Sequence, residues 1–242
     1  MKFFVGLHQP SDAQHFARCL ISIARLRDRK SNFQVGEWIL DSGAFTEVAT
    51  YGDYREPVEV YAAQINRWSW CGNLVAAVAQ DYVCAPPVLA KTGLTVADHQ
   101  RLTIERYDAL RTLVRPETYV LPTIQGWQPD EYAAHVRAYG DRLAQGAWVG
   151  VGSIAARSED VTTVQSILRA IKQERPDLRL HAFGLKITAL SEPEIVALLE
   201  SADSITWSLA ARKEGRSKDA NSWREAARFV KRIDTLIERV AA

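Results

Sequence analysis

The amino-acid sequence predicts an α/β fold, a TIM-type (β/α)8-like barrel formed by one domain over residues 1–242. Apolar, strand-like runs alternate with helix-like segments along the chain, which is the pattern of a parallel sheet covered by helices. Such barrels usually hold eight strands in about 250 residues, close to the length of this chain. Seven strands are expected here, so the eighth is predicted to be missing, degenerate or hidden between 208 and 222.

The first half of the chain provides three expected strands and three expected helices. The short apolar run 2–7 predicts a strand, and the spacing in 14–27 predicts a helix with Phe16 and Leu20 on its apolar face. Pro57 suits the first turn of the following helix. In order, the expected strands are 2–7, 37–45 and 74–83, and the expected helices are 14–27, 57–70 and 96–113.

The alternation continues through the second half. The cap residues Ser158–Asp160 predict the start of a helix that ends near Glu174. An open doubly wound sheet is the alternative fold, but Gly6–Pro10 lacks the Gly-rich nucleotide fingerprint of that class. The expected strands are 118–124, 148–154, 179–185 and 203–207, the other expected helices are 130–143, 191–199 and 223–240, and 212–220 is expected to be a basic polar loop.

Composition predicts a folded protein without a strongly charged surface. Hydrophobic residues make up 47% of the chain, and the formal net charge is +1, although 25–30 and 212–218 are locally basic. Cys19, Cys71 and Cys84 lie far apart and include no Cys-x-x-Cys pair, so neither a disulfide framework nor a zinc knuckle is indicated. No run approaches the roughly 20 apolar residues of a membrane span, and the N-terminus lacks signal-peptide features, so a cytoplasmic protein is expected.

Chemistry-bearing residues follow the expected strands. In a parallel barrel the active site lies at the carboxyl ends of the strands. These ends carry the carboxylates Asp41, Asp81 and Asp203, together with Gln125 and several glycines. Asp and Gln side chains suit the hydrogen-bonding edge of a flat heterocycle. Two carboxylates also suit chemistry at a glycosidic carbon, where one attacks the sugar and the other moves a proton, with no metal or other cofactor.

Six motifs in order resemble those of the tRNA-guanine transglycosylases, zinc-containing (β/α) barrels that exchange guanine for a 7-deazaguanine base. Each motif is common by chance, but six in the correct order at strand ends are specific. The motifs are Asp41-Ser42-Gly43-Ala44-Phe45, Ala79-Gln80-Asp81-Tyr82-Val83-Cys84, Thr123-Ile124-Gln125-Gly126, Val149-Gly150-Val151-Gly152-Ser153, His181-Ala182-Phe183-Gly184 and Ala202-Asp203-Ser204-Ile205-Thr206-Trp207.

The resemblance implies a role for each matched residue. Asp203 matches the nucleophile, although an alternative register would place Thr206 there, and Asp41 matches the residue that handles the proton. Ser153 replaces the usual Glu of its motif, which leaves the preference for the base substituent open. The residues implied to bind the base are Ser42, Gly43, Asp81, Gln125, Gly126, Gly150, Gly152, Phe183 and Gly184.

The absence of any cysteine after Cys84 distinguishes the chain from the tRNA enzymes, whose zinc subdomain it lacks. The chain resembles more closely the short, zinc-free, DNA-directed branch from phages and bacteria, whose enzymes insert 7-deazaguanines into DNA. The implied partners are DNA with its target guanine, a free base such as 7-cyano-7-deazaguanine, and a helper protein where the duplex must be opened. No cofactor is implied.

Basic residues beside the strand ends are candidates for gripping phosphates near the pocket. Trp127 is expected to cover the barrel rather than to stack on a base, Tyr82 could do either, and His8 is expected to make a structural hydrogen bond. The candidate nucleic-acid contacts are Arg157, Lys186, Arg212, Lys213, Arg216 and Lys218.

Three other functions stay open from the sequence. The chain could be a tRNA-guanine transglycosylase or a non-catalytic accessory subunit of the same superfamily. It could also be a glycoside hydrolase that uses Asp41 and Asp203 as its carboxylate pair. A hydrolase would be expected to display aromatic sugar platforms in place of the Gln-Gly and Gly-x-Gly motifs at the strand ends.

Overall fold

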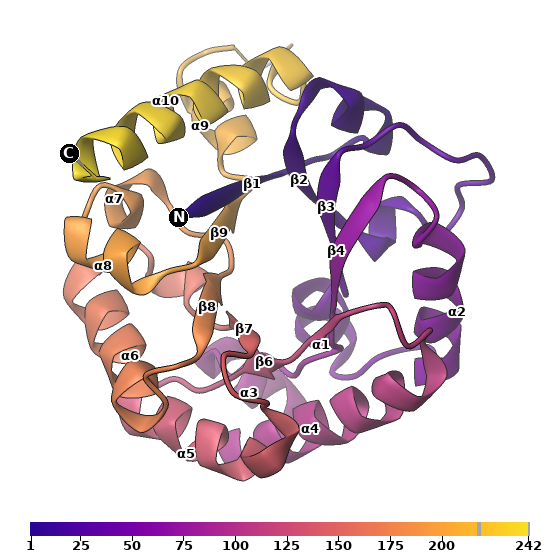
Figure 1. Cartoon of the computed structure of the whole chain (residues 1–242), viewed down its shortest axis with the longest axis vertical. Coiled ribbons are helices and arrows are strands. Elements are labelled where there is room, and N and C mark those ends of the chain that lie inside the picture. Colours follow the sequence, from indigo (N-terminus) through magenta and orange to yellow (C-terminus); the bar gives the residue numbers. More distant parts are fainter. Residues whose placement is uncertain (217–218, 242) are drawn as a thin grey trace.

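The computed structural model describes residues 1–216 and 219–241, and it confirms the predicted α/β barrel. Within these residues nine strands pair in parallel, in the order β5-β4-β3-β2-β1-β9-β8-β7-β6, and helices surround them (Figure 1). The strands are β1 Lys2–Gly6, β2 Arg18–Ser22, β3 Glu37–Asp41, β4 Asn73–Val78, β5 Val120–Leu121, β6 Thr123–Ile124, β7 Trp148–Val151, β8 Arg179–Ala182 and β9 Ser201–Ser204.

The barrel is nearly closed, with one seam at Pro122. β5 pairs with β4, and β6 pairs with β7, so the two ends of the sheet are consecutive pieces of one chain segment. Proline has no N–H to donate to a ladder, which explains the interruption of the strand predicted at 118–124. The Pro122 carbonyl still accepts the Gly150 N–H at 2.8 Å. The seam is therefore a change of partner within one strand-like segment.

The prediction of a helix at 14–27 is wrong. This segment contains strand β2, which lies between two 3-10 helices, η1 Pro10–His15 and η2 Ile23–Arg25. β2 pairs with both β1 and β3, and its burial alternates with a period of two residues. Pairing with two neighbouring strands outweighs the helical spacing of Phe16 and Leu20. β2 supplies the strand that was expected to be missing or to lie between 208 and 222.

Most other expected elements are present with shifted ends. The strand expected at 37–45 ends at Asp41, and Gly43, with φ 71°, turns the chain into a helix that the sequence did not reveal. The strand expected at 203–207 spans Ser201–Ser204 instead, and the first two residues of the loop expected at 212–220 belong to helix α9 Trp207–Lys213. The helices are α1 Ala44–Tyr51, α2 Val58–Trp68, α3 Pro86–Thr92, α4 Val96–Leu113, α5 Pro129–Tyr139, η3 Gly140–Arg142, η4 Ala155–Arg157, α6 Val161–Glu174, α7 Ile187–Leu190, α8 Pro193–Leu198, α9 Trp207–Lys213 and α10 Trp223–Ala241.

Two apolar layers hold the barrel together. The larger layer lies between the strands and the surrounding helices, and α10 joins it by packing Phe229 against Phe3 of β1, with ring centroids 6.1 Å apart. A smaller cluster, which includes Phe4, Ile39 and Leu121, forms where the alternate side chains of the strands meet. This packed cluster supports the strand ends from below. In the described part of the chain, no helix is long and apolar enough to cross a membrane.

Candidate active site

A cavity of about 560 Å³ opens at the carboxyl ends of the strands, where parallel barrels carry their chemistry. Seven strand ends contribute polar or aromatic side chains to its walls. These contributions bring together residues that lie far apart in the sequence, from Ser22 to Asp203, as expected from the alternation of strands and helices. The predicted site residues that line the cavity are Asp41, Gly43, Asp81, Gln125, Gly152, Phe183 and Asp203.

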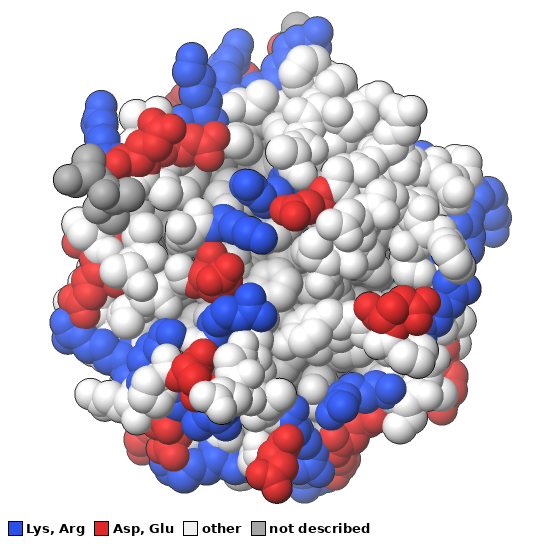
Figure 2. Space-filling model, viewed as in Figure 1, with Lys and Arg blue, Asp and Glu red and all other residues white. Residues whose placement is uncertain are grey.

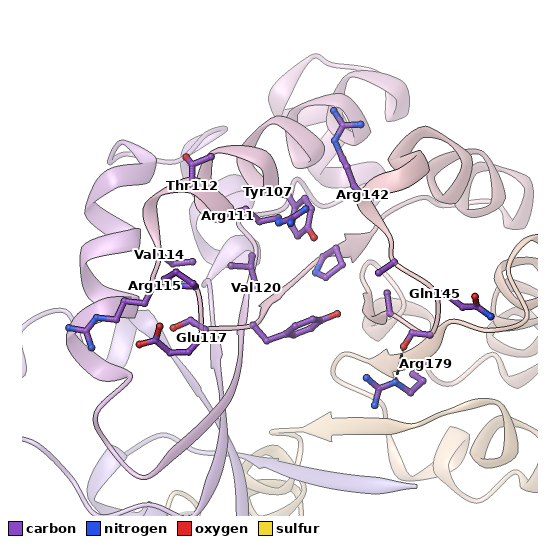
Figure 3. A pocket seen from close by; sticks show the side chains of 17 residues that line it. Tyr107, Arg111, Thr112, Val114, Arg115, Glu117, Val120, Arg142, Gln145 and Arg179 are labelled. Atoms are coloured by element: carbon purple, nitrogen blue, oxygen red, sulfur yellow. Dashed lines mark hydrogen bonds between the residues drawn. The ribbon is translucent and has the colours of Figure 1, made fainter.

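A second cavity, of about 740 Å³, opens at the amino ends of β5, β7 and β8 (Figure 3). Its charged lining is mainly arginine, and none of the predicted site residues reaches it. Arg142 is paired with Asp108, and Arg179 donates to the Gly146 carbonyl at 2.9 Å. This cavity holds no carboxylate pair of the kind that glycosidic chemistry needs. The carboxyl-end cavity is therefore the candidate active site.

Asp203 at the end of β9 and Asp41 at the end of β3 provide two acids to the candidate site. Oδ1 of Asp203 accepts the backbone N–H of Gly184 at 3.0 Å. Oδ2 of Asp41 accepts the backbone N–H of Gly43 at 3.0 Å. Burial raises the pKa of Asp41, and the negative charge of Asp203 raises it further. Asp41 therefore keeps its proton to a higher pH than an exposed aspartic acid does.

Asp81 and Gln125 form a hydrogen-bonded pair on another wall. The Gln125 carboxamide donates to Oδ2 of Asp81, and its Oε1 accepts the hydroxyl of Ser153 at 2.6 Å. The Ser153 oxygen in turn accepts the backbone N–H of Cys84 at 2.8 Å, so its hydrogen is free to point at Gln125. This chain of bonds fixes which end of the carboxamide faces Asp81. Burial raises the pKa of Asp81 to about 7, and the charge of Asp41 adds to the rise.

The backbone of Gln125 is held from behind by two buried side chains. Gln100 donates to its carbonyl at 2.7 Å, and its N–H donates to Nδ1 of His135 at 2.8 Å. Nδ1 of His135 must therefore be unprotonated, which agrees with burial lowering the pKa of this histidine to about 4. The side chain of Gln125 is presented to the cavity from a rigid backbone.

Two glycines make room for site side chains. A Cβ atom on Gly150 would overlap the ring of Phe183, and a Cβ atom on Gly152 would overlap the carboxamide of Gln125. The need for close approach, rather than an unusual backbone angle, explains glycine at both positions. Gly150 therefore shapes the cavity through Phe183, although it does not line the cavity itself.

Four residues predicted to bind the base do not line the cavity: Ser42, Gly126, Gly150 and Gly184. Ser42 is buried and faces a separate cavity of about 180 Å³ beside Tyr54, where its hydroxyl has no hydrogen-bond partner among the described residues. Gly126 faces α5, where a Cβ atom would crowd the backbone and ring of Tyr132. Successive residues after a strand point in different directions, so a motif match alone does not place each member in the site.

Most of the residues predicted to contact phosphates already interact with other side chains of the protein. Arg157 stacks over the ring of Trp127 at 4.6 Å, and Lys186 pairs with Glu159 at 2.7 Å. Arg216 bridges Glu214 and Glu225, and Arg212 donates to Asn221. Lys213 is exposed at the end of α9, and Lys218 lies outside the described residues. The basic cluster is thus partly neutralised by its own neighbours.

The aromatic residues and His8 largely have packing roles. Trp127 packs beside a buried cluster near α1 and α3, and the buried ring of Tyr82 makes edge contact with Tyr54. His8 shares a hydrogen bond of 2.9 Å with Ser208 and packs against Trp207. None of Trp127, Tyr82 and His8 lines the candidate site.

Several residues that line the candidate active site were not predicted from the sequence. Ser22 and Arg25 reach the cavity from the end of β2 and from η2, a region that the sequence predicted to be helical. Phe45, which is 65% exposed, and Ile205 give the cavity an apolar edge. Phe45 is the last residue of a matched motif, so that motif could have identified it. In the described ranges, no cluster of three or more His, Cys, Asp and Glu side chains could hold a metal ion.

Comparison with known proteins identifies the family. No curated protein matches the sequence. The family model described as "DpdA: DeoxyPurine in DNA protein A" matches residues 1–233, which is nearly the whole chain. This match agrees with the transglycosylase resemblance of the six motifs. The chain therefore belongs to the DpdA family, and it is an enzyme of the transglycosylase type.

Proposed function

We propose that this protein exchanges guanine in DNA for a free 7-deazaguanine base, such as 7-cyano-7-deazaguanine, through a covalent intermediate on Asp203. The observation that carries the proposal is the meeting of two acids, Asp41 and Asp203, with the Asp81–Gln125 pair around one cavity. The acids can act on a glycosidic bond, and the pair can hold the edge of a purine. Membership of the DpdA family supports DNA as the substrate.

In the first half-reaction, Asp203 attacks C1′ of the target deoxyguanosine. The bond from a carboxylate oxygen to C1′ forms, the bond from C1′ to N9 of guanine breaks, and N9 takes the electron pair. Asp41 then gives its proton to the departing guanine. The raised pKa of Asp41 supports this role, because the acid must still carry its proton near neutral pH.

In the second half-reaction, the free 7-deazaguanine occupies the place of guanine. Asp41, now a carboxylate, takes the proton from the five-membered ring of this base. The nitrogen attacks C1′, and Asp203 leaves as a carboxylate. One cavity serves both steps, since guanine and a 7-deazaguanine share the six-membered edge that Asp81 and Gln125 would hold.

The remaining hydrogen-bonding capacity of the Asp81–Gln125 pair suits that edge. Oδ1 of Asp81 would accept from N1–H and the amino group of guanine, and the second amide hydrogen of Gln125 would donate to O6. Phe183 would cover one face of the base. The target guanine must leave the base stack to reach this position, and Arg25 at the cavity is one candidate for holding a flanking phosphate.

The test is a base-exchange assay on a single-stranded DNA that contains one guanine, with 7-cyano-7-deazaguanine as the free base and mass spectrometry of the nucleosides as the readout. The wild-type protein should insert the modified base. Asp203→Asn should lower the rate at least about 1,000-fold, and Asp41→Asn about 100-fold or more. Asp141→Asn, at an exposed carboxylate on η3, serves as the matched control and should leave the rate unchanged.

The same assay separates the alternatives. Exchange into a tRNA transcript but not into DNA would assign the protein to the tRNA enzymes. Failure of exchange with either nucleic acid, by a protein that still binds DNA, would favour an accessory subunit. Full exchange by the Asp203→Asn variant would refute the covalent mechanism.

A further inference from the structure

His181 is a buried histidine directly beside the nucleophile. It lies on β8 opposite Ser201 of β9, and its side chain is fully buried. The rings of Phe4, Trp148 and Phe183 surround it, with centroid distances of 6.1, 5.8 and 4.8 Å. An imidazole in such an apolar setting needs partners for both ring nitrogens.

The neighbours of Nδ1 determine which ring nitrogen carries the proton. The indole N–H of Trp148 can only donate, and it donates to Oγ of Ser201 at 3.0 Å. The same hydroxyl lies 2.9 Å from Nδ1 of His181, so its own hydrogen is available for this nitrogen. Nδ1 is then the acceptor, and the proton of the neutral ring is on Nε2.

The opposite tautomer is disfavoured by the surroundings of Nε2. Nε2 of His181 has no hydrogen-bond partner among the described residues, and it lies 3.4 Å from Oδ1 of Asp203. With the proton on Nδ1, a lone pair on Nε2 would face the carboxylate. With the proton on Nε2, an N–H group faces it, and a modest approach of the two groups completes a hydrogen bond.

The two oxygens of Asp203 therefore have different surroundings. Oδ1 receives the backbone N–H of Gly184 at 3.0 Å and faces Nε2 of His181. Oδ2 accepts no hydrogen bond from the described residues and belongs to a side chain that lines the cavity. Holding one oxygen from behind orients the carboxylate and leaves the other oxygen free for attack.

We propose that His181 is a positioning residue for Asp203, with its Nε2–H tautomer set by Ser201 and Trp148, and that Oδ2 is the oxygen that attacks C1′. This inference rests on the proposed function, whose nucleophile it orients. His181 gives up no proton: the Oδ2–C1′ bond forms and the C1′–N9 bond breaks while Nε2–H stays on the imidazole. When the intermediate is resolved, the same N–H and the Gly184 amide stabilise the negative charge that returns to Asp203.

Three substitutions at one position test the proposal. His181→Gln can place an amide N–H near the position of Nε2, His181→Asn can reach only the position of Nδ1, and His181→Phe has neither group. Single-turnover formation of the covalent DNA adduct should slow about 10- to 100-fold in the Phe and Asn variants. It should return to within a few-fold of the wild-type rate in the Gln variant. The dissociation constant for free guanine should stay the same in all three.

The pattern of the rates decides the outcome. Equal losses in the Gln, Asn and Phe variants, or a wild-type rate in the Phe variant, would overturn the positioning role. Melting temperatures and guanine binding identify a variant that has failed to fold. A wild-type protein that forms no adduct with DNA would instead count against the proposed function.

A spectroscopic readout tests the inference without any activity. Long-range 1H–15N correlation spectra of the wild-type protein distinguish a protonated ring nitrogen from an unprotonated one, and loss of the signals in His181→Gln assigns them. The proposal predicts a proton on Nε2 and none on Nδ1. Ser201→Ala should weaken this preference and slow adduct formation. A proton on Nδ1 in the wild-type protein would overturn the proposal whatever the function proves to be.

Discussion

Buried carboxyl groups at the candidate site are expected to lower stability at neutral pH. Asp81 is buried, and burial is the main cause that raises its pKa from 3.8 to about 7. The folded protein therefore binds this proton more tightly than the unfolded chain does. Stability from this group is fully present below pH 3.8 and is lost as the pH rises toward 7. At neutral pH, Asp81 therefore lowers the free energy of unfolding.

Asp81→Asn should remove this pH dependence. Between pH 5 and pH 8 the wild-type protein should lose on the order of 2 kcal/mol of unfolding free energy through Asp81, and the variant should not. An asparagine oxygen can still accept the bond from Gln125. Urea unfolding at several pH values measures the difference, and parallel stability curves for the two proteins would contradict the assigned cause. The variant should also lose base exchange.

Gly152 tests how closely the backbone must approach Gln125. In Gly152→Ala the added methyl group overlaps the carboxamide of Gln125, so this side chain must leave the position in which it donates to Asp81. Base exchange should fall at least about 10-fold, since displacement of a recognition group is costly to the rate. Gly93→Ala is the control: its Cβ meets open space, although φ is 69° there, so it should lower stability without lowering the exchange rate of the folded protein.

At the scale of elements, α1 is held against the site by an ion-pair cluster. Glu47, which is buried, accepts bonds at 2.8 Å from Arg27, which follows η2, and from Arg55 in the loop before α2. The hydrogen bonds from Arg55, with further help from Arg27, lower the pKa of Glu47 to about 2. The cluster joins three separate segments next to the Asp41-Ser42-Gly43 turn.

Glu47→Gln should destabilise the protein by on the order of 2 kcal/mol at pH 7, because two guanidinium groups lose their shared carboxylate. Because the pKa of Glu47 is lowered, its stabilising effect is present above pH 4.5 and is lost as the pH falls toward 2. The difference in stability between the wild-type protein and the variant should therefore become smaller in acid. Denaturant unfolding at pH 7 and pH 3 measures it. Glu105→Gln, at an exposed pair with Arg101, should change stability by less than about 0.5 kcal/mol.

The sequence could predict the elements whose signal is local. The helix at Val96–Leu113 was predicted with its observed bounds, and Asp41 and Gln125 were placed at strand ends because apolar runs stop there. β2 could not be recognised, since its strand conformation depends on pairing with β1 and β3. Because β2 was not predicted, Arg25, which follows this strand, was not placed at the cavity.

The sequence motifs also could not predict the direction in which each side chain points. Ser42 adjoins Asp41 in the sequence, yet it faces a different cavity. Gly126 follows Gln125, yet it packs against α5. The hydrogen bonds that orient His181 depend on Trp148 and Ser201, which lie on two other strands. Such a set of contacts exists only once the barrel is assembled.

At the scale of the whole molecule, positive and negative charges nearly balance. The formal net charge is +1, and the face shown in Figure 2 has Lys and Arg side chains interspersed with Asp and Glu side chains. Near the candidate site, the described residues Arg25, Arg212 and Lys213 form no ion pair. Binding to DNA should therefore use few phosphate contacts, with the flipped base supplying much of the specificity.

The salt dependence of DNA binding measures this expectation. With about three phosphate contacts, a plot of the logarithm of the association constant for single-stranded DNA against the logarithm of salt concentration should have a slope near −2. Fluorescence anisotropy gives the slope, and the double variant Arg25→Ala, Arg212→Ala should bring it closer to zero by about 1. A wild-type slope steeper than about −6 would point to an extended basic surface.

The most direct measurement is the identification of the residue that becomes bonded to DNA. The wild-type protein is mixed with guanine-containing single-stranded DNA without any free base, quenched in denaturant, digested and analysed by mass spectrometry. We predict a single deoxyribosyl ester, on Asp203, that disappears in Asp203→Asn and decays when 7-cyano-7-deazaguanine is added before the quench. An ester on Asp41, or base exchange with no trapped adduct at Asp203, would contradict this account.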